Sequence, residues 1–257
     1  MKEKSSRRND STSWGAVAPW YDELLETDGD TYQSKVIWPN LLRLLGNIKS
    51  KKILDLACGQ GFFSREIFKQ GAEVTGVDIS EELIVLARKH SDAKIKFLFA
   101  NAERLPFPDQ SFDTVIAILA LQNIENLFGA TAEIARVLKA DGRFILVLNH
   151  PAFRIPKESF WEFDAKQNIE YRRIGRYLSE SRAEIIMNPG KGADKTTVSF
   201  HRPLQMYFKA LAKNGLAVTR LEEWISHRES AKGPRKEAED KARKEFPLFL
   251  SLEAKKI

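Results

Sequence analysis

The feature that most restricts the fold is an alternation of short apolar runs with amphipathic segments along residues 52–148. The runs typical of buried strands lie at 52–57, 73–77, 95–99, 114–119 and 143–148. Repeated strand–helix–strand units with apolar strands predict a mostly parallel sheet with helices on both faces, joined by right-handed crossovers. We therefore expect an α/β fold of the Rossmann-like, doubly wound kind.

Residues that commonly begin and end helices and strands support this alternation. Gly71 follows a helix predicted over 62–70, at the place where glycine often ends a helix. Ser80 is predicted to cap the next helix through its side-chain oxygen. Asp141 and Gly142 predict a turn that leads into the last run.

The regions on either side of the alternation have different patterns. Residues 1–13 are polar and charged and predict a disordered leader, and the clustered aromatics of 14–45 predict an N-terminal helical cover. Residues 151–197 show no strand period before Val198 and are too long for a simple connection, so they predict an inserted lid. The elements expected after it are a helix over 204–214 and strands over 217–221 and 246–252.

The composition excludes several classes of protein. With 43% hydrophobic residues the chain is not disordered throughout, and its one cysteine, Cys58, cannot form an internal disulfide. No apolar run reaches the roughly 18 residues of a membrane span, and the first 13 residues lack the apolar core of a secretory signal. We expect a cytoplasmic protein without a membrane span or a metal site.

The charge pattern disfavours a nucleic-acid partner. The chain has 41 Lys and Arg against 35 Asp and Glu, a net charge of +6. In its most highly charged stretch, 228–245, acids alternate with bases, whereas a nucleic-acid interface is usually a one-sided basic stripe. The sequence therefore favours a small molecule as the substrate.

Two glycines and an acid mark a candidate ligand site at the ends of the first two predicted strands. Gly59 and Gly61 follow the first strand, where the absence of a Cβ lets a ligand lie against the backbone. Asp78 ends the second strand, where its carboxylate can accept hydrogen bonds from a ribose diol. The phosphate loop GxxxxGK[ST] is absent, and the dinucleotide pattern GxGxxG has Ser64 in place of its third glycine. Asp55, inside the first strand, favours a ligand that carries a cationic amino group.

Four segments in order resemble the motifs of class I S-adenosylmethionine-dependent methyltransferases. They are ILDLACGQG, VTGVDIS, NAERLPFPDQSFDTVI and RVLKADGRFILVLNHP, and they are most similar to the ubiquinone/menaquinone-methyltransferase-like group called methyltransferase type 11. The resemblance is dense between Ile53 and Pro151 and implies S-adenosylmethionine as the cofactor. It also implies that residues 14–257 form one methyltransferase domain.

The resemblance implies a role for each matching residue. Asp55 and the backbone near Gly59 hold the methionine part, Asp78 binds the ribose, and Ile79 and Asn101 contact the adenine. The cofactor-binding residues expected in this way are Tyr21, Asp55, Ala57, Cys58, Gly59, Gly61, Asp78, Ile79, Asn101, Ala102, Glu103, Leu119 and Ala120. Many relatives have Asp where this chain has Asn101, and relatives often have His where it has Gln122.

The chemistry of the implied cofactor requires few catalytic side chains. Its sulfonium is already an electrophile, so the protein positions the acceptor for in-line displacement and excludes water. A general base would help if the acceptor were a hydroxyl or an acidic carbon. His150, His201 and Tyr21 are the candidates for that role. Cys58 is expected to be a packed residue of the turn.

The sequence also restricts the methyl acceptor. After the fourth strand it has neither the cysteine of a cytosine methylase nor the Asn/Asp-Pro-Pro-aromatic turn of amino-methylating nucleic-acid enzymes. The aromatics of 151–197, with Arg154, Arg172, Arg173 and Arg176 beside them, suggest a flat or partly anionic acceptor. An RNA methyltransferase, a non-catalytic cofactor-binding module and a nicotinamide oxidoreductase remain alternatives. The acceptor atom and the oligomeric state stay open.

Overall fold

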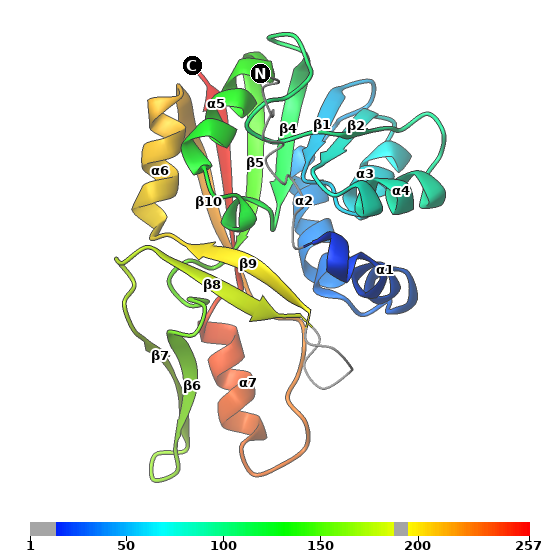
Figure 1. Cartoon of the computed structure of the whole chain (residues 1–257). Helices are drawn as coiled ribbons and strands as arrows, with labels where there is room; N and C mark the ends of the chain where they lie inside the picture. The colour runs from blue at the N-terminus through cyan, green and yellow to red at the C-terminus, as the bar shows by residue number, and fades with distance from the viewer. Residues whose placement is uncertain (1–13, 188–194) are drawn as a thin grey trace, which may run out of the picture.

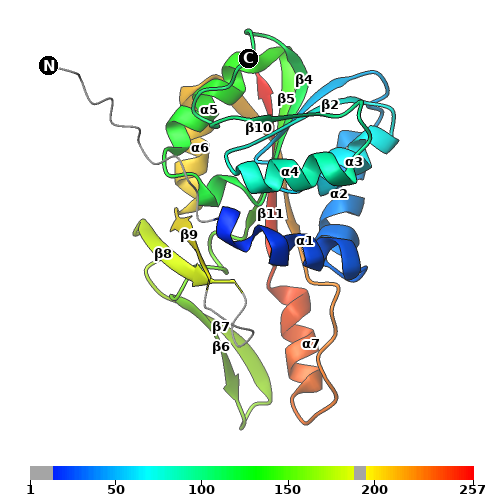
Figure 2. The same ribbon diagram turned by 45° about the vertical axis from the view of Figure 1, so that its right-hand side comes forward.

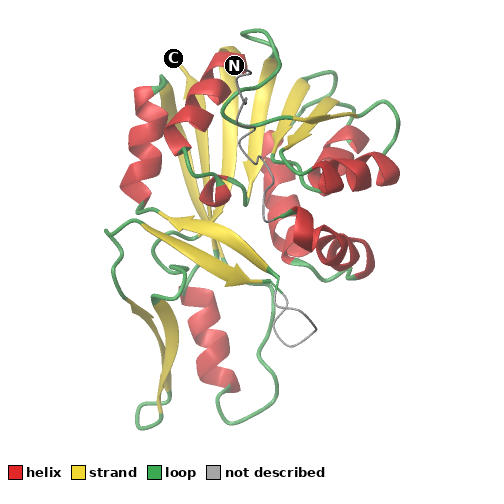
Figure 3. Cartoon of the chain, in the orientation of Figure 1, coloured by secondary structure: helices red, strands yellow, loops and turns green. Residues whose placement is uncertain are grey.

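The computed structural model describes residues 14–187 and 195–257, so the expected leader, 1–13, and part of the expected lid lie outside the described residues. A seven-stranded sheet forms the centre, in the order β10-β11-β5-β4-β1-β2-β3 (Figures 1 and 3). Its strands are β1 (Lys52–Leu56), β2 (Glu73–Asp78), β3 (Lys96–Phe99), β4 (Phe112–Ile118), β5 (Leu138–Asn149), β10 (Leu216–Trp224) and β11 (Phe249–Lys256). The helices are α1 (Ala18–Thr27), α2 (Trp38–Leu45), α3 (Phe62–Lys69), α4 (Glu81–His90), α5 (Leu127–Val137), α6 (Leu204–Lys213) and α7 (Lys236–Glu245).

The sheet is parallel except at one strand, which confirms the expected fold class. β1 pairs in parallel with β2 on one side and with β4 on the other, while β11 runs antiparallel to both of its neighbours. The strand order therefore reverses direction between β1 and β4. In open α/β sheets, ligands bind outside the carboxyl ends of the strands at such a switch point.

Helices cover both faces of the sheet because successive strand residues point to opposite sides. On one face Leu54 of β1 and Leu146 of β5 belong to a core that contains residues of α5 and α6. On the other face Ile53 and Ile145 belong to a core with residues of α2, α3 and α4. The apolar runs predicted as strands are thus buried on both sides, as their continuous hydrophobicity requires.

The region after β5 differs from its prediction. We predicted no strand before Val198, but β6 (Ser159–Asp164) pairs with β7 (Ile169–Ile174), and β8 (Ser181–Ile186) pairs with β9 (Thr196–His201), each as an antiparallel hairpin. Most residues of the first hairpin are exposed or half-buried, so neither of its strands has the apolar face that a period-2 pattern needs.

Several element boundaries also differ from those predicted. Asp141 and Gly142 lie within the bounds of β5, but Asp141 has a left-handed φ of 58°, and the pairing with β4 passes from Leu138 directly to Arg143. The two residues thus interrupt the strand just before its regular part begins. The last strand is Phe249–Lys256, which lies further along the chain than 246–252. The Ser80 cap is confirmed, because its side chain accepts a hydrogen bond from the Leu83 N–H.

The helix α1 lies beside α4, below the strands in Figure 2. Asp22 of α1 contacts His90 of α4 at 3.0 Å, and Glu26 of α1 accepts hydrogen bonds from Arg65 and Gln60. Asp22, Glu26 and His90 each offer a potential metal-ligand atom within 4.8 Å of the others. Since each of the three side chains makes one of the contacts above, we interpret the cluster as one that attaches α1 to α3 and α4. Within 14–187 and 195–257, no helix is both long and apolar enough to cross a bilayer.

Gly61 provides a test of the packing beneath the first glycine turn. It precedes α3 with a φ of 84°, and a Cβ placed there would lie 2.9 Å from the Phe97 ring. We expect Gly61→Ala to lower the free energy of unfolding by about 2–4 kcal/mol, from left-handed backbone strain together with overpacking. Denaturant titration would measure this. Gly233→Ala is the control, since nothing lies within 4 Å of its Cβ position, and an equal loss in both variants would contradict the explanation.

Candidate active site

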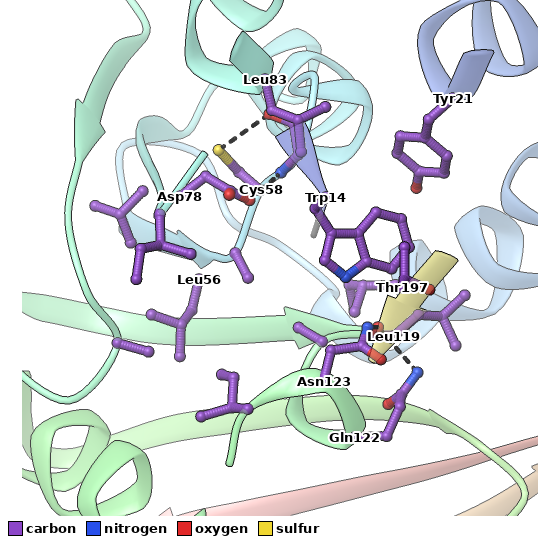
Figure 4. Close-up of a pocket in the computed structure, with 18 of the residues that line it drawn as sticks. Trp14, Tyr21, Leu56, Cys58, Asp78, Leu83, Leu119, Gln122, Asn123 and Thr197 are labelled. Atoms are coloured by element: carbon purple, nitrogen blue, oxygen red, sulfur yellow. Dashed lines mark hydrogen bonds between the residues drawn. The ribbon is translucent and has the colours of Figure 1, made fainter. Parts of the chain in front are cut away.

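A cavity of about 490 Å³ lies at the switch point, beyond the carboxyl ends of β1, β2 and β4 (Figure 4). Its volume falls in the range of small-molecule sites, about 300–1,000 Å³. Three parts of the chain line it: the strand ends, the N-terminal helices from Trp14 to Gln33, and the β8–β9 hairpin. The cavity is therefore assembled from segments that are far apart in the sequence.

The backbone is strained at the ends of two neighbouring strands that border the cavity. Ala57, after β1, has a φ of 56°, and Leu119, after β4, has a φ of 54°. Both are left-handed conformations that cost a non-glycine residue about 1–2 kcal/mol. The side-chain amides of Gln122 and Asn123 both donate hydrogen bonds to the Leu119 carbonyl, at 2.9 and 3.1 Å. These bonds hold the turn in place.

The Asp78 carboxylate forms hydrogen bonds with the backbone that follows β1 and with the backbone that follows β2. One carboxylate oxygen accepts a hydrogen bond from the Gly59 N–H and the other from the Ser80 N–H, each at 2.9 Å. Burial raises the pKa of this carboxyl, and the backbone N–H groups oppose the change. Each oxygen keeps a lone pair that can accept from a hydroxyl group of a ligand.

Asp55 is the second buried acid at this edge and is only 2% exposed. Its Oδ2 accepts a hydrogen bond from the Ser64 hydroxyl at 2.6 Å. Burial raises the pKa of Asp55 to about 7, and the nearby charge of Asp78 adds to the increase. Two acids that oppose each other's ionisation favour a cationic ligand beside them. Ser64 thus positions the Asp55 carboxylate. The sequence did not predict this role, because Ser64 was noted only as the residue in place of the third glycine of the GxGxxG pattern.

An apolar slot continues from Asp78 along the edge of the sheet. Its walls come from the segment after β2 and from the turn after β3, and they include Ile79, Leu83, Ala100 and Ala102. Asn101 also lines it, and the Asn101 side-chain oxygen accepts a hydrogen bond from the Glu103 N–H at 2.8 Å. A flat ring can be enclosed there between aliphatic side chains.

The N-terminal helices supply an aromatic wall. Trp14, Trp20, Tyr21 and Leu24 line the cavity, and the rings of Trp14 and Tyr21 meet edge to face with centroids 5.7 Å apart. Burial raises the pKa of Tyr21 to about 12, which the Gln33 side chain only partly opposes. The Tyr21 hydroxyl therefore stays protonated near neutral pH and can donate a hydrogen bond, while its expected role as a general base stays a prediction.

Among the described residues of the expected lid segment, those that border the cavity belong to the second hairpin or directly follow β8. Ile185 and Met187 come from the β8 side and Thr197 and Ser199 from β9, each pair two residues apart and thus on one face. The Ser199 hydroxyl donates to the Gln122 carbonyl at 3.4 Å.

The four arginines that suggested an anionic acceptor do not line the cavity. Arg172 donates to the Phe153 carbonyl, and Arg173 and Arg176 form ion pairs with Glu162 and Glu158.

The structure brings together twelve of the expected cofactor-binding residues and leaves out one. Those that line the cavity are Tyr21, Asp55, Ala57, Cys58, Gly59, Asp78, Ile79, Asn101, Ala102, Glu103, Leu119 and Ala120. Gly61 does not, because its Cβ side faces Phe97 and the packed interior.

The two histidine candidates also lie outside the cavity lining. His150 pairs with Glu223 at 2.7 Å, and burial lowers its pKa. His201 contacts the Tyr177 carbonyl at 2.8 Å. Each imidazole is thus engaged elsewhere, and the expectation of a histidine base is not supported.

Sequence reasoning missed a large part of the wall. The lining residues not expected as binding residues are Trp14, Trp20, Leu24, Gln33, Leu56, Phe63, Val77, Leu83, Ala100, Ile118, Gln122, Asn123, Ile124, Glu125, Asn149, Ile185, Met187, Thr197 and Ser199. A signal was available for Leu24, which lies one helical turn after Tyr21. No local signal marked the hairpin residues.

Comparisons with known proteins agree with the geometry. Residues 54–146 match the family described as "Methyltransferase domain", type 11. A demethylmenaquinone methyltransferase of Chlorobaculum tepidum is 39% identical over 145 residues, or 55% of this chain and 58% of that protein. A demethylmenaquinone methyltransferase of Tropheryma whipplei is 36% identical over 112 residues, which are 42% of this chain and 46% of that protein. The chain thus spans about half the length of the curated relatives it matches.

A solved structure extends the similarity to most of the chain. It is an S-adenosylmethionine-dependent methyltransferase from Mesorhizobium loti, with a TM-score of 0.69 and 28% identity, and the match covers 88% of this chain and 100% of that one. The matched family region, 54–146, contains the strand ends that carry Asp55 and Asp78.

The raised pKa of Asp55 predicts a pH-dependent cost to stability. The pKa of Asp55 is about 7 in the folded chain, against about 3.9 in the unfolded chain. Ionisation of Asp55 therefore lowers the free energy of unfolding progressively as the pH rises from 4 to 7. We expect Asp55→Asn to raise the free energy of unfolding by roughly 2–4 kcal/mol at pH 8 and by progressively less towards pH 5. Thermal melts across this range would measure it.

Asp113→Asn is the matched control for this pH dependence. Burial of Asp113 is outweighed by hydrogen bonds from Lys139 and the Lys52 N–H, so its pKa is lowered. That variant should be less stable than the parent at neutral pH, with a difference that disappears in acid. If both variants shifted stability in the same direction, the assignment for Asp55 would be wrong.

Proposed function

We propose that the chain is a class I S-adenosylmethionine-dependent methyltransferase, the family that its sequence and fold resemble, and that it transfers a methyl group from this cofactor to a small-molecule acceptor. One observation carries the proposal. The carboxylates of Asp55 and Asp78 are both buried and both line one cavity, at the switch point of a parallel sheet. The cofactor supplies both of the groups that these acids suit, a cationic amino group and a ribose diol.

The donor and acceptor groups of the cavity support a specific placement of the cofactor. Asp78 accepts from the two ribose hydroxyls with the lone pairs that Gly59 and Ser80 leave available. Asp55 balances the charge of the amino group, either directly or through water. The adenine occupies the slot beside Ile79 and Leu83, near Asn101.

In the reaction the protein acts chiefly by positioning. When bound, S-adenosylmethionine supplies an electrophilic methyl group on a sulfonium centre, and this chemistry belongs to the cofactor. Trp14, Trp20 and Tyr21 cover the cavity, exclude water and hold the acceptor for in-line attack. The described lining residues with charged side chains are all acids, and the proposed mechanism assigns a general base to none of them.

A small acceptor agrees with the shape of the cavity and with the relatives. An aromatic wall and a hairpin enclose the cavity, whereas a nucleic acid needs an open basic groove. The two relatives named above act on demethylmenaquinone, a small molecule. RNA methylation and a non-catalytic cofactor-binding role are the alternatives, and the cytoplasm is the proposed location.

Removing the Asp78 carboxylate should weaken cofactor binding. In Asp78→Ala the two ribose hydroxyls lose their partner, so we expect the affinity for S-adenosylhomocysteine to fall by about 2–3 kcal/mol. Isothermal titration calorimetry would measure this. Asp109→Ala is the control, since that carboxylate is exposed and pairs with Arg136. An unchanged affinity in Asp78→Ala would contradict the site assignment.

Cofactor affinity should also depend on pH through Asp55. The carboxylate pairs with the amino group only when ionised, and its pKa is about 7 in the unligated chain. As the pH falls from 8 to 6 we expect binding to weaken, by up to about tenfold per pH unit below 7, with protons released on binding. Calorimetric titrations with S-adenosylhomocysteine across this pH range would measure the affinity, and repeating them in two buffers with different ionisation enthalpies would measure the proton release. In Asp55→Asn the dependence should disappear.

Two further measurements separate the alternatives. The enzyme releases S-adenosylhomocysteine when it is given cofactor and a pool of small acceptors, whereas a binding module does not. RNA binding that falls steeply with salt would favour the RNA methyltransferase.

A further inference from the structure

One arginine holds the backbone of the segment 121–125, which follows β4. Four of the five residues of this segment line the cavity, while Leu121 is buried behind them. Arg202, the residue after β9, donates through Nη1 to the Leu121 carbonyl at 3.3 Å. Its Nη2 donates to the Ile124 carbonyl at 2.9 Å and to the Glu125 carbonyl. Three carbonyls of one cavity wall thus depend on a side chain that is not itself in the lining.

The Arg202 guanidinium is buried although its ion-pair partner is not in direct contact. Its side chain is 6% exposed, and Glu180, which pairs with it at 3.8 Å, is 54% exposed. The buried Tyr207 hydroxyl is a further hydrogen-bond partner. A buried charge is costly unless hydrogen bonds compensate for it. The three carbonyls supply much of that compensation, because a guanidinium has a planar fork of five N–H donors.

The segment that Arg202 holds also supports the strained turn after β4. Leu119 has a left-handed φ of 54°. The side-chain amides of Gln122 and Asn123 both donate to the Leu119 carbonyl (Figure 4). A strained conformation of this kind persists only where its surroundings fix it. Because both amides belong to 121–125, the turn depends on the position of that segment.

The Leu119 turn lies at the edge of the sheet where the cofactor is proposed to bind. β4 pairs in parallel with β1, so that Ile116 is opposite Asp55 and both strands end at the same edge. Leu119 lines the cavity and is one of the residues expected to bind the cofactor. A change in the shape of this turn therefore changes the cofactor site.

We propose that Arg202 is a positioning residue that holds the segment 121–125, and through it the Leu119 turn, in the shape that binds S-adenosylmethionine. The inference rests on the proposed function and adds a residue to the support of its site. Without the guanidinium the turn relaxes, and binding has to restore the left-handed conformation, so the apparent affinity falls. The strain of one such conformation corresponds to about tenfold in affinity.

Two variants separate the fork of Arg202 from its charge. Arg202→Lys keeps the positive charge but lacks the planar fork that the three carbonyls engage, and Arg202→Met removes both. We expect both variants to bind S-adenosylhomocysteine about tenfold more weakly than the parent chain. Calorimetric titrations would measure the affinities, at a temperature at which melts show every chain to be folded. An unchanged affinity in Arg202→Lys would overturn the proposal.

Arg143→Met is the matched control for a general loss of stability. Arg143 also donates to backbone carbonyls, those of Leu44 and Leu45, at 3.2 and 2.9 Å, and it pairs with Glu253 at 3.3 Å. It is not one of the residues that line the cavity. This variant should lose stability and keep its affinity for S-adenosylhomocysteine. An equal fall in affinity in Arg143→Met would contradict a specific role of Arg202.

A glycine at position 119 gives a readout that a merely structural arginine would not change. Glycine adopts a left-handed φ without strain, so in the Leu119→Gly background Arg202→Met should lower the affinity by no more than about twofold. The two affinities are compared within one background, so the effect of the lost Leu119 side chain cancels. A full tenfold fall in this background would show that Arg202 does not act through the turn.

The outcomes distinguish this inference from the function on which it rests. If S-adenosylhomocysteine does not bind to the parent chain, the proposed function fails. If it binds to the parent chain and to Arg202→Met with equal affinity, the positioning role alone is wrong. Should Arg202→Met not fold, Arg202→Lys replaces it in both comparisons.

Discussion

The burial of two carboxylates at neighbouring strand ends is the constraint on which the rest of this structure depends. Parallel pairing places Asp55 of β1 opposite Gly76 of β2, and Asp78 ends the same strand, so both acids reach one edge of the sheet. Burial raises both pKa values, and a bound cation would relieve that electrostatic cost. The apolar cores on the two faces of the sheet supply the stability that offsets it.

The cavity divides into a part that the family match covers and a part that it does not. The acids and the strained Leu119 turn lie within 54–146. Much of the aromatic wall and the β8–β9 hairpin lie outside that range. The family match therefore includes the two acids, while much of the wall that encloses the cavity lies outside it.

The site could be predicted wherever a local pattern places a residue at a strand end. Asp55, Gly59 and Asp78 were found in this way, because a buried strand followed by a glycine turn fixes where the chain leaves the sheet. Gly61 lies in the same motif, but its missing Cβ serves packing against Phe97. A motif thus identifies the turn, and the packing around it decides which of its residues meet the ligand.

The sequence by itself determined the parallel sheet, its order of elements and the acids at its edge, because these follow from hydrophobic period and strand endings. Only the tertiary structure decided what encloses the cavity. The hairpin residues near Thr197 carry no local signal, and His150 and His201 looked like candidates until the packing gave them other partners. Contacts between segments far apart in the chain depend on how the side chains of all these segments pack together. The sequence of one segment alone therefore does not predict them.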